Sequence, residues 1–376
     1  MSRRGNAEGS IFQRTADGLW VAAVTVDGRR RVAYGRTREL AAAKLQQLQQ
    51  EARAGLPAVD QRATVGTYLT RWLSEVTPRL RPSTAARYAG LVRGQLIPNL
   101  GRIKLHQLQP SDVRAMMASV QRDGLSPRTA GHCRAVLRAA LADAERDNFV
   151  HRNAAKLADA PHLAPPQPVV LSPDQVRSVL DACTDPSLRR LAVVGITTGL
   201  RMGEQLGLRW QDVEQEHHCL YVRTTLQRIG GIYSLGEPKS ATSRRIVALP
   251  EAALEALHEE KRDQAVARLA AGGRWHQPIA DLCFTTAAGA PRSGTSVTHL
   301  FQDALARAGL PRLRWHDLRA AHGALLLAGG TDISVVSRRL GHSSVALTSR
   351  HYGGVADQLQ QEAASRLDLL LQRPSG

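Results

Sequence analysis

Residues 316–354 read HDLRAAHGALLLAGGTDISVVSRRLGHSSVALTSRHYGG, and this stretch decides how the carboxyl-terminal part of the chain folds. We expect helices throughout it. His316 and His342 are side chains whose ordinary pKa permits proton exchange near neutral pH, and Arg319 carries a permanent planar charge. Tyr352 follows His342 by ten residues, just past the short helical segment VALTSRHY. Side chains of these types, close together in sequence, are candidates for a functional site.

Upstream of this stretch, the chain passes from helical patterns to β-prone segments. The segments are PDQVRSVLDAC (173–183), SLRRLAVVGIT (187–197), LYVRTTLQR (220–228), GIYSL (231–235) and RRIVAL (244–249). Such a series, followed by helices, predicts an α+β fold with one small antiparallel sheet. We assign this fold to residues 170–376.

A proline-rich connector precedes that region. PHLAPPQPVV at 161–170 holds four prolines in ten positions and cannot continue a helix, so we place a linker at 161–169. Residues 64–150 read as helices, each of which starts at a Ser or Thr cap or beside a proline. Their basic edges suit contact with phosphates, although solvated arginines on an ordinary helix bundle would have the same pattern.

Residues 1–57 predict a separate small module. Short β-prone pieces within 9–35 are separated by Asp-Gly turn signals at 17–18 and 27–28, which indicates a three-stranded sheet. From Thr37 the sequence is rich in strong helix formers. One sheet with one helix is either a minimal basic binding module or a structural appendage, because so short a segment carries little signal of its own.

The charge of the chain indicates a polyanionic partner. Lys and Arg number 50 against 33 Asp and Glu, which gives a formal net charge of +17. The excess is concentrated, since residues 1–160 hold 26 of the basic side chains and 13 of the acidic ones. Nucleic acid is the leading candidate. No run approaches the ~18 apolar residues needed to cross a bilayer, so we expect no membrane contact and a cytoplasmic, nucleoid-associated protein.

The sequence predicts no metal site and no cofactor. The four cysteines lie far apart and form no Cys-x-x-Cys pair. His217, His218 and Cys219 are consecutive, and adjacent residues rarely converge on one metal. The chain also lacks a glycine-rich phosphate loop that ends in Lys-Ser or Lys-Thr.

Four segments, in this order, resemble the tyrosine recombinase (phage integrase) family. They are TTGLRMGEQLGLRW (197–210), GEPKSATSRRIVALP (236–250), HDLRAAHGALLLAGG (316–330) and LGHSSVALTSRHYGG (340–354). The resemblance covers about residues 60–376, and the small module at 1–57 is similar to the arm-type DNA-binding module that some integrases add. It implies a mainly α, multi-domain protein with a helical core-binding (SAM-like) domain at 58–160 and an α+β catalytic domain at 170–376.

The resemblance also implies residues that handle the phosphate. Breaking a phosphodiester through a tyrosine requires charge stabilisation on two non-bridging oxygens and a proton donor for the departing 5′-hydroxyl. Arg201 and Arg319 would grip the scissile phosphate with bidentate forks. Lys239 would be the general acid toward the leaving oxygen. Glu204 would be the accessory acid that orients the pocket, unless it forms a simple surface salt bridge.

The remaining roles follow from the same resemblance. His316 would do acid/base work, His342 would hydrogen-bond near the phosphate, and Tyr352 would be the nucleophile. The product of its attack is a transient 3′-phosphotyrosine, so strand rejoining needs neither ATP nor a metal.

The expected function is therefore site-specific recombination of duplex DNA, which integrates or excises a mobile element such as a phage. We expect a homotetramer on two attachment sites and leave open an accessory DNA-bending or excision factor. An apolar stripe at 359–371 would dock on a neighbouring protomer or fold back on its own domain. Two alternatives remain: a type IB topoisomerase, which shares this chemistry, and a non-catalytic DNA-binding regulator.

Overall fold

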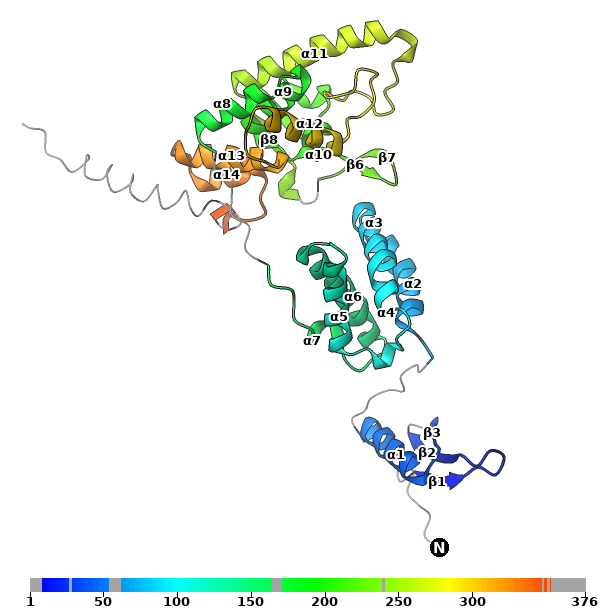
Figure 1. Cartoon of the computed structure of the whole chain (residues 1–376). Coiled ribbons are helices and arrows are strands. Elements are labelled where there is room, and N and C mark those ends of the chain that lie inside the picture. Colours follow the sequence, from blue (N-terminus) through cyan, green and yellow to red (C-terminus); the bar gives the residue numbers. More distant parts are fainter. Residues whose placement is uncertain are drawn as a thin grey trace, which may run out of the picture. The chain divides into compact units, whose positions relative to one another are not determined.

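The chain forms two compact units, Met1–Ala164 and Pro165–Gly376 (Figure 1). The structure, a computed structural model, describes residues 9–26, 29–53, 62–163, 171–238, 241–346, 348–349 and 352. Lys239 and the apolar stripe at 359–371 lie outside the described residues. The predicted fold class is confirmed: the chain is mainly helical, with a small amino-terminal sheet and an α+β second unit. No helix of the described part combines the length and the apolar composition that spanning a bilayer requires.

The first residues of unit one form a sheet covered by a helix. Strands β1 (Ser10–Gln13), β2 (Trp20–Val26) and β3 (Arg29–Gly35) pair antiparallel in that order, and α1 (Arg38–Arg53) packs against them. Small and medium side chains make the core between sheet and helix, namely Ala22, Val24, Ala41 and Leu45.

A bundle of helices with its own hydrophobic core makes up the rest of unit one. Its α-helices are α2 (Val65–Val76), α3 (Pro82–Leu91), α4 (Ile97–Leu100), α5 (Pro110–Arg122), α6 (Pro127–Arg146) and α7 (Ala154–Leu157). The caps follow the sequence signals, since the Thr64 hydroxyl accepts from the N–H of Thr67 and the Ser126 hydroxyl from that of Thr129.

Helix α9 (Pro186–Thr198) is the centre of the second unit. It packs against α11 (Glu251–Ala271) and α13 (Trp315–Ala328), and most of its residues are buried. The helix ends at Gly199, whose φ of 66° lies in the left-handed region that glycine tolerates. The other helices are α8 (Pro173–Ala182), α10 (Met202–Leu206), α12 (Gly294–Arg307) and α14 (Ile333–Leu340).

The β-prone segments of this unit form two sheets, whereas the sequence predicted one. Strands β4 (Val213–Glu214), β5 (Cys219–Val222) and β8 (Arg245–Ala248) make one antiparallel sheet, and β6 (Thr225–Ile229) and β7 (Ile232–Gly236) make a separate hairpin.

The run LYVRTTLQR breaks between β5 and β6 because β6 lies against α10. The hydroxyl of Thr224 donates to the carbonyl of Gly207 at 2.7 Å. A β carbon at Gly207 would come 2.5 Å from the backbone nitrogen of Leu226, so only glycine permits this approach.

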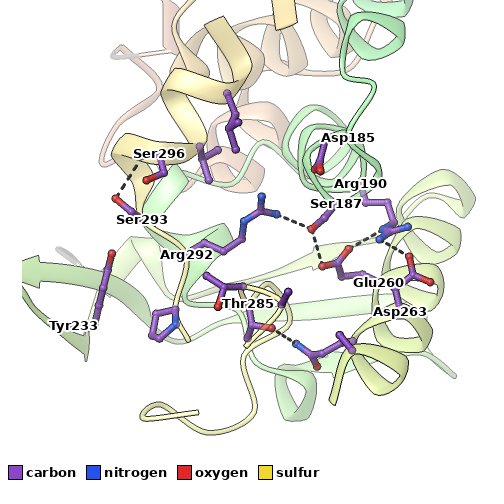
Figure 2. A pocket seen from close by; sticks show the side chains of 17 residues that line it. Asp185, Ser187, Arg190, Tyr233, Glu260, Asp263, Thr285, Arg292, Ser293 and Ser296 are labelled. Atoms are coloured by element: carbon purple, nitrogen blue, oxygen red, sulfur yellow. Dashed lines mark hydrogen bonds and ion pairs between the residues drawn. The ribbon is translucent and has the colours of Figure 1, made fainter. Parts of the chain in front are cut away.

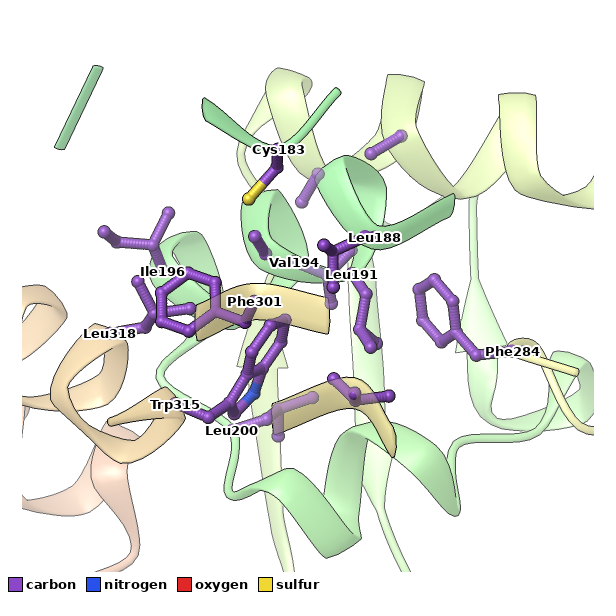
Figure 3. Packing of buried hydrophobic residues seen from close by; sticks show 14 of the residues in the cluster. Cys183, Leu188, Leu191, Val194, Ile196, Leu200, Phe284, Phe301, Trp315 and Leu318 are labelled. Atoms are coloured by element: carbon purple, nitrogen blue, oxygen red, sulfur yellow. The ribbon is translucent and has the colours of Figure 1, made fainter. Parts of the chain in front are cut away.

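The core of the second unit holds α13 in place. The rings of Phe301 and Trp315 meet edge to face with centroids 5.1 Å apart (Figure 3). The Trp315 indole N–H donates to the Gln205 side-chain oxygen at 3.2 Å, so this large side chain is buried with its polar atom bonded. The first turn of α13, which carries His316, is thereby fixed to α10 and α12.

Candidate active site

Three arginines from different elements converge on the carboxyl end of α14. This helix ends at Gly341, with φ of 63°, and the N–H of His342 bonds back to Ser337. The last carbonyls of a helix have no partner within it and carry partial negative charge. Here the consecutive carbonyls of residues 339, 340 and 341 accept hydrogen bonds from the side chains of Arg245, Arg319 and Arg201, respectively.

Arg319 is the most deeply buried of the two predicted phosphate-binding arginines. Its side chain spans two elements, since it donates to the carbonyl of Gly199 at 2.6 Å and to that of Leu340. Burial, and then the charge of Arg201, lowers the pKa of Arg319 to about 9. A second cation beside a buried guanidinium is unfavourable unless an anion binds there, so the arrangement suits a phosphate.

Arg201 is anchored by Glu204 and remains partly open to solvent. Its Nη1 donates to Glu204 Oε1 at 2.8 Å, and its backbone N–H donates to Glu204 Oε2 at 3.0 Å. Its Nη2 reaches the carbonyl of Gly341 at 3.2 Å. The Arg201 side chain is 38% exposed and that of Glu204 is 4% exposed, so Glu204 is no surface salt bridge.

The two predicted histidines lie near this cluster and differ in environment. His316, in the first turn of α13, is exposed. Even so, partial burial of its ring lowers its pKa, followed by the charges of Arg319 and Arg314, so the ring is neutral at neutral pH. His342 Nδ1 lies 2.8 Å from the hydroxyl of Thr348, which is fully buried.

Tyr352 is buried against α13 with its hydroxyl over a glycine. The phenol donates to the carbonyl of Arg319 at 3.5 Å, and burial raises its pKa, partly offset by the charge of Arg319. A β carbon on Gly323 would overlap the phenol oxygen, so the absence of a side chain there makes room for the ring. Tyr352 also packs with Ala324 and Leu340.

Of the predicted site residues, the structure therefore brings Arg201, Glu204, Arg319, His316, His342 and Tyr352 to one region. Lys239 lies outside the described residues. Among the described residues, no group of three or more His, Cys, Asp or Glu side chains is placed to hold a metal ion.

Sequence reasoning missed Arg245 and the pair formed by Arg339 and His322. Arg339 Nε donates to His322 Nε2 at 3.2 Å, while His322 Nδ1 lies 2.8 Å from the carbonyl of Ile196. A neutral imidazole with its proton on Nδ1 satisfies both contacts. The available signal in the sequence was a histidine inside the apolar run AAHGALLLA at 320–328.

Two pockets of the second unit differ in charge. The first, of about 560 Å³, is lined by a closed network in which Arg292 and Ser187 lead to Glu260, Arg190 and Asp263 (Figure 2). None of the predicted site residues that the structure describes lines it. Its acidic groups are already paired, so the network is structural.

The second pocket, of about 640 Å³, reaches His316, and the described residues that line it include no Asp or Glu. Its lining includes three arginines and two histidines, namely Arg228, Arg292, Arg314, His299 and His316. A pocket with this lining favours an anion.

Comparison with known families matches most of the chain to integrases. The phage integrase family matches residues 169–358, and the SAM-like N-terminal domain of phage integrases matches 64–118. An integrase of Streptomyces ambofaciens is 29% identical over 99% of this chain and 98% of its own length. A XerC-like tyrosine recombinase of Caldanaerobacter subterraneus is 25% identical over 89% of this chain and 90% of its own length.

Solved structures show the same fold. The Tn1549 transposon integrase in complex with transposon right end DNA aligns with a TM-score of 0.68, at 21% identity, over 80% of this chain and 99% of that one. A lambda integrase dimer bound to a core site aligns with a TM-score of 0.59, at 18% identity, over 93% of this chain and 96% of that one.

His322 makes the stability of the second unit dependent on pH. Burial, and then the charge of Arg339, lowers the pKa of His322 to about 4 from its ordinary 6.5. The unfolded chain therefore binds a proton before the folded chain does, and stability is lost as the pH falls from about 6.5 to about 4. The loss is roughly 3 kcal/mol, at about 1.4 kcal/mol per pKa unit.

His322→Gln removes this titration while its amide can still donate to Ile196 and accept from Arg339. Between pH 7 and pH 4.5, we expect the unfolding free energy of the unmodified protein to fall relative to that of the variant. Urea denaturation at the two pH values measures both free energies. Parallel pH profiles would show that His322 is not the titrating group.

Proposed function

The chain belongs to the phage integrase family and is a tyrosine recombinase, an enzyme that cuts and rejoins DNA at specific sites, and we propose that Tyr352 is its nucleophile. The observation that supports this assignment is that the buried Tyr352 phenol rests against α13, whose Arg319 shares the end of α14 with Arg201, the guanidinium that Glu204 holds. Relatives of matching length are integrases and a recombinase, so a type IB topoisomerase is not favoured.

In the proposed reaction, Tyr352 Oη attacks the scissile phosphorus. A bond forms between that oxygen and phosphorus, and the bond from phosphorus to the 5′-oxygen breaks. The phenol proton passes to His316, whose lowered pKa keeps it neutral and able to accept it. Lys239 gives a proton to the leaving 5′-oxygen.

Arg201 and Arg319 stabilise the charge that builds on the non-bridging oxygens during this step. Their permanent charge and planar donors match two oxygens of a phosphate, while His342 hydrogen-bonds beside them. Attack by a 5′-hydroxyl on the 3′-phosphotyrosine reverses the step with the same number of bonds, so rejoining requires no ATP. The second pocket, which is lined by arginines and reaches His316, could hold the DNA backbone next to the scissile phosphate.

The domain assignment is part of the proposal. Residues 58–160 would be the core-binding domain, 161–169 the linker and 170–376 the catalytic domain. The match of the SAM-like model to residues 64–118 supports the first of these. The enzyme would act as a tetramer on two attachment sites at the nucleoid. Lambda integrase, a structural relative, is known as a tetramer bound to a Holliday junction.

Residues 1–57 would bind arm-type DNA sites through the sheet face opposite α1. Cross-strand pairing puts Phe12, Val21 and Tyr34 in one row on that face. Phe12 is 42% and Tyr34 47% exposed, and the Arg14 guanidinium lies 5.2 Å from the centre of the Tyr34 ring. Exposed aromatic and basic side chains together suit a nucleic acid surface.

Tyr352→Phe tests the nucleophile. The variant loses one oxygen in a packed site, so it should fold and bind its attachment site normally but form no covalent adduct on a nicked substrate. Gel shift measures binding, and a denaturing gel measures the adduct. An adduct that persists in this variant would mean that another residue attacks, and an adduct absent from the unmodified protein would favour a non-catalytic regulator.

Arg201→Ala and Arg319→Ala test the phosphate clamp. Each should slow adduct formation by at least about 10²–10³, because one donor to a developing oxyanion contributes that much. Arg268→Ala is the control, since this arginine lies near the exposed end of α11 and its removal changes the net charge equally. Rates near those of the control would discard the clamp.

Removal of residues 1–57 tests the amino-terminal module. Affinity for distal arm-type sites should fall, and its salt dependence should weaken because phosphate contacts are lost, while cleavage at the core site stays detectable. Equal affinity for all sites before and after the removal would make the module a structural appendage.

A further inference from the structure

Arg245 is a buried cation whose donors are all directed into the protein. Its Nε donates to the carbonyl of Arg339 at 2.6 Å, and its Nη1 to that of Ser243 at 3.0 Å. Its Nη2 and Nη1 reach the two carboxylate oxygens of Glu204 at 3.0 and 3.4 Å. With 6% of its side chain exposed, Arg245 cannot contact DNA itself.

Glu204 is shared between Arg245 and Arg201. One of its oxygens, Oε1, accepts from Arg201 Nη1 at 2.8 Å, and Oε2 accepts from Arg245 Nη2 at 3.0 Å. Burial alone would raise the pKa of Glu204, but the charge and hydrogen bonds of Arg245 hold it below its usual range. The group is therefore a carboxylate, and both arginines compete for its negative charge.

The net charge of the group formed by Glu204 and its two arginines depends on Arg245. Arg201, Arg245 and Glu204 together carry a net charge of +1. Without Arg245, the remaining pair would be neutral, and Glu204 Oε2, left with only the backbone N–H of Arg201, could draw the Arg201 side chain inward. The Arg201 side chain is 38% exposed and is the member of the cluster that can reach a ligand.

We propose that Arg245 is a positioning residue for DNA cleavage: by sharing Glu204, it leaves Arg201 with an uncompensated positive charge and free donors for the scissile phosphate. This inference rests on the proposed function of Arg201. Arg245 also ties β8, which begins six residues after Lys239, to α10 and to the last turn of α14.

A charge suppressor tests the proposal. Arg245→Gln should slow adduct formation on a nicked substrate by at least about tenfold, while DNA affinity stays near that of the unmodified protein. Adding Glu204→Gln restores the net charge of +1 to the cluster, so the double variant should cut faster than Arg245→Gln alone. A purely structural role predicts the opposite, because two buried substitutions would compound.

A neutral substrate supplies the second readout. A methylphosphonate at the scissile position replaces one charged oxygen with a methyl group, so cleavage depends less on a nearby cation. The defect of Arg245→Gln, relative to the unmodified protein, should shrink on this substrate. A defect of equal size on both substrates, with no gain in the double variant, would overturn the proposal.

Three further variants separate the explanations. Arg244→Gln removes the same charge from the neighbouring residue, which is 59% exposed and pairs with Glu237, and should cut normally. Arg245→Lys keeps the buried charge without the fork and should be intermediate, which covers the case in which Arg245→Gln does not fold. If Arg201→Ala cuts normally, the proposed function of Arg201 fails; if it is slow while Arg245→Gln is not, only this inference fails.

Discussion

The site is built around the last carbonyls of α14, which have no hydrogen-bond partner within the helix. A helix end leaves such groups without partners, and here each of three consecutive carbonyls takes a guanidinium from β8, α10 or α13. One short helix thus holds side chains from residues up to 140 positions away from it in sequence. Gly341 ends this helix in a left-handed conformation, which directs the chain toward His342.

Concentrating cations in this way opposes folding, and the structure offsets the repulsion without neutralising it. Carbonyl dipoles and the buried carboxylate of Glu204 face the arginines of the cluster. Positive charge is left over, held in fixed geometry before any ligand arrives. Such preorganisation is what electrostatic stabilisation of a transition state requires, because the donors do not have to reorient during the reaction.

Most of the fold and much of this cluster could be predicted from the sequence, because they depend on local signals. Contacts between distant segments could not be predicted in this way. Helices carry caps and prolines that are local signals, and Arg201, Arg319 and Tyr352 stand in recognisable segments. Arg245 could not be predicted, because alternation in RRIVAL allows either Arg245 with Val247 or Ile246 with Ala248 to face inward. The second sheet was missed because the contact of β6 with Gly207 joins segments that no local pattern connects.

The space that Gly323 leaves for the Tyr352 ring limits which amino acids the sequence can have at position 323. The Tyr352 ring and any side chain at position 323 would occupy the same volume. Only glycine is therefore tolerated at this position while the ring packs against α13. Gly323, which has no side chain of its own, is thereby tied to Tyr352, the proposed nucleophile, because even a methyl group at that position would displace the ring.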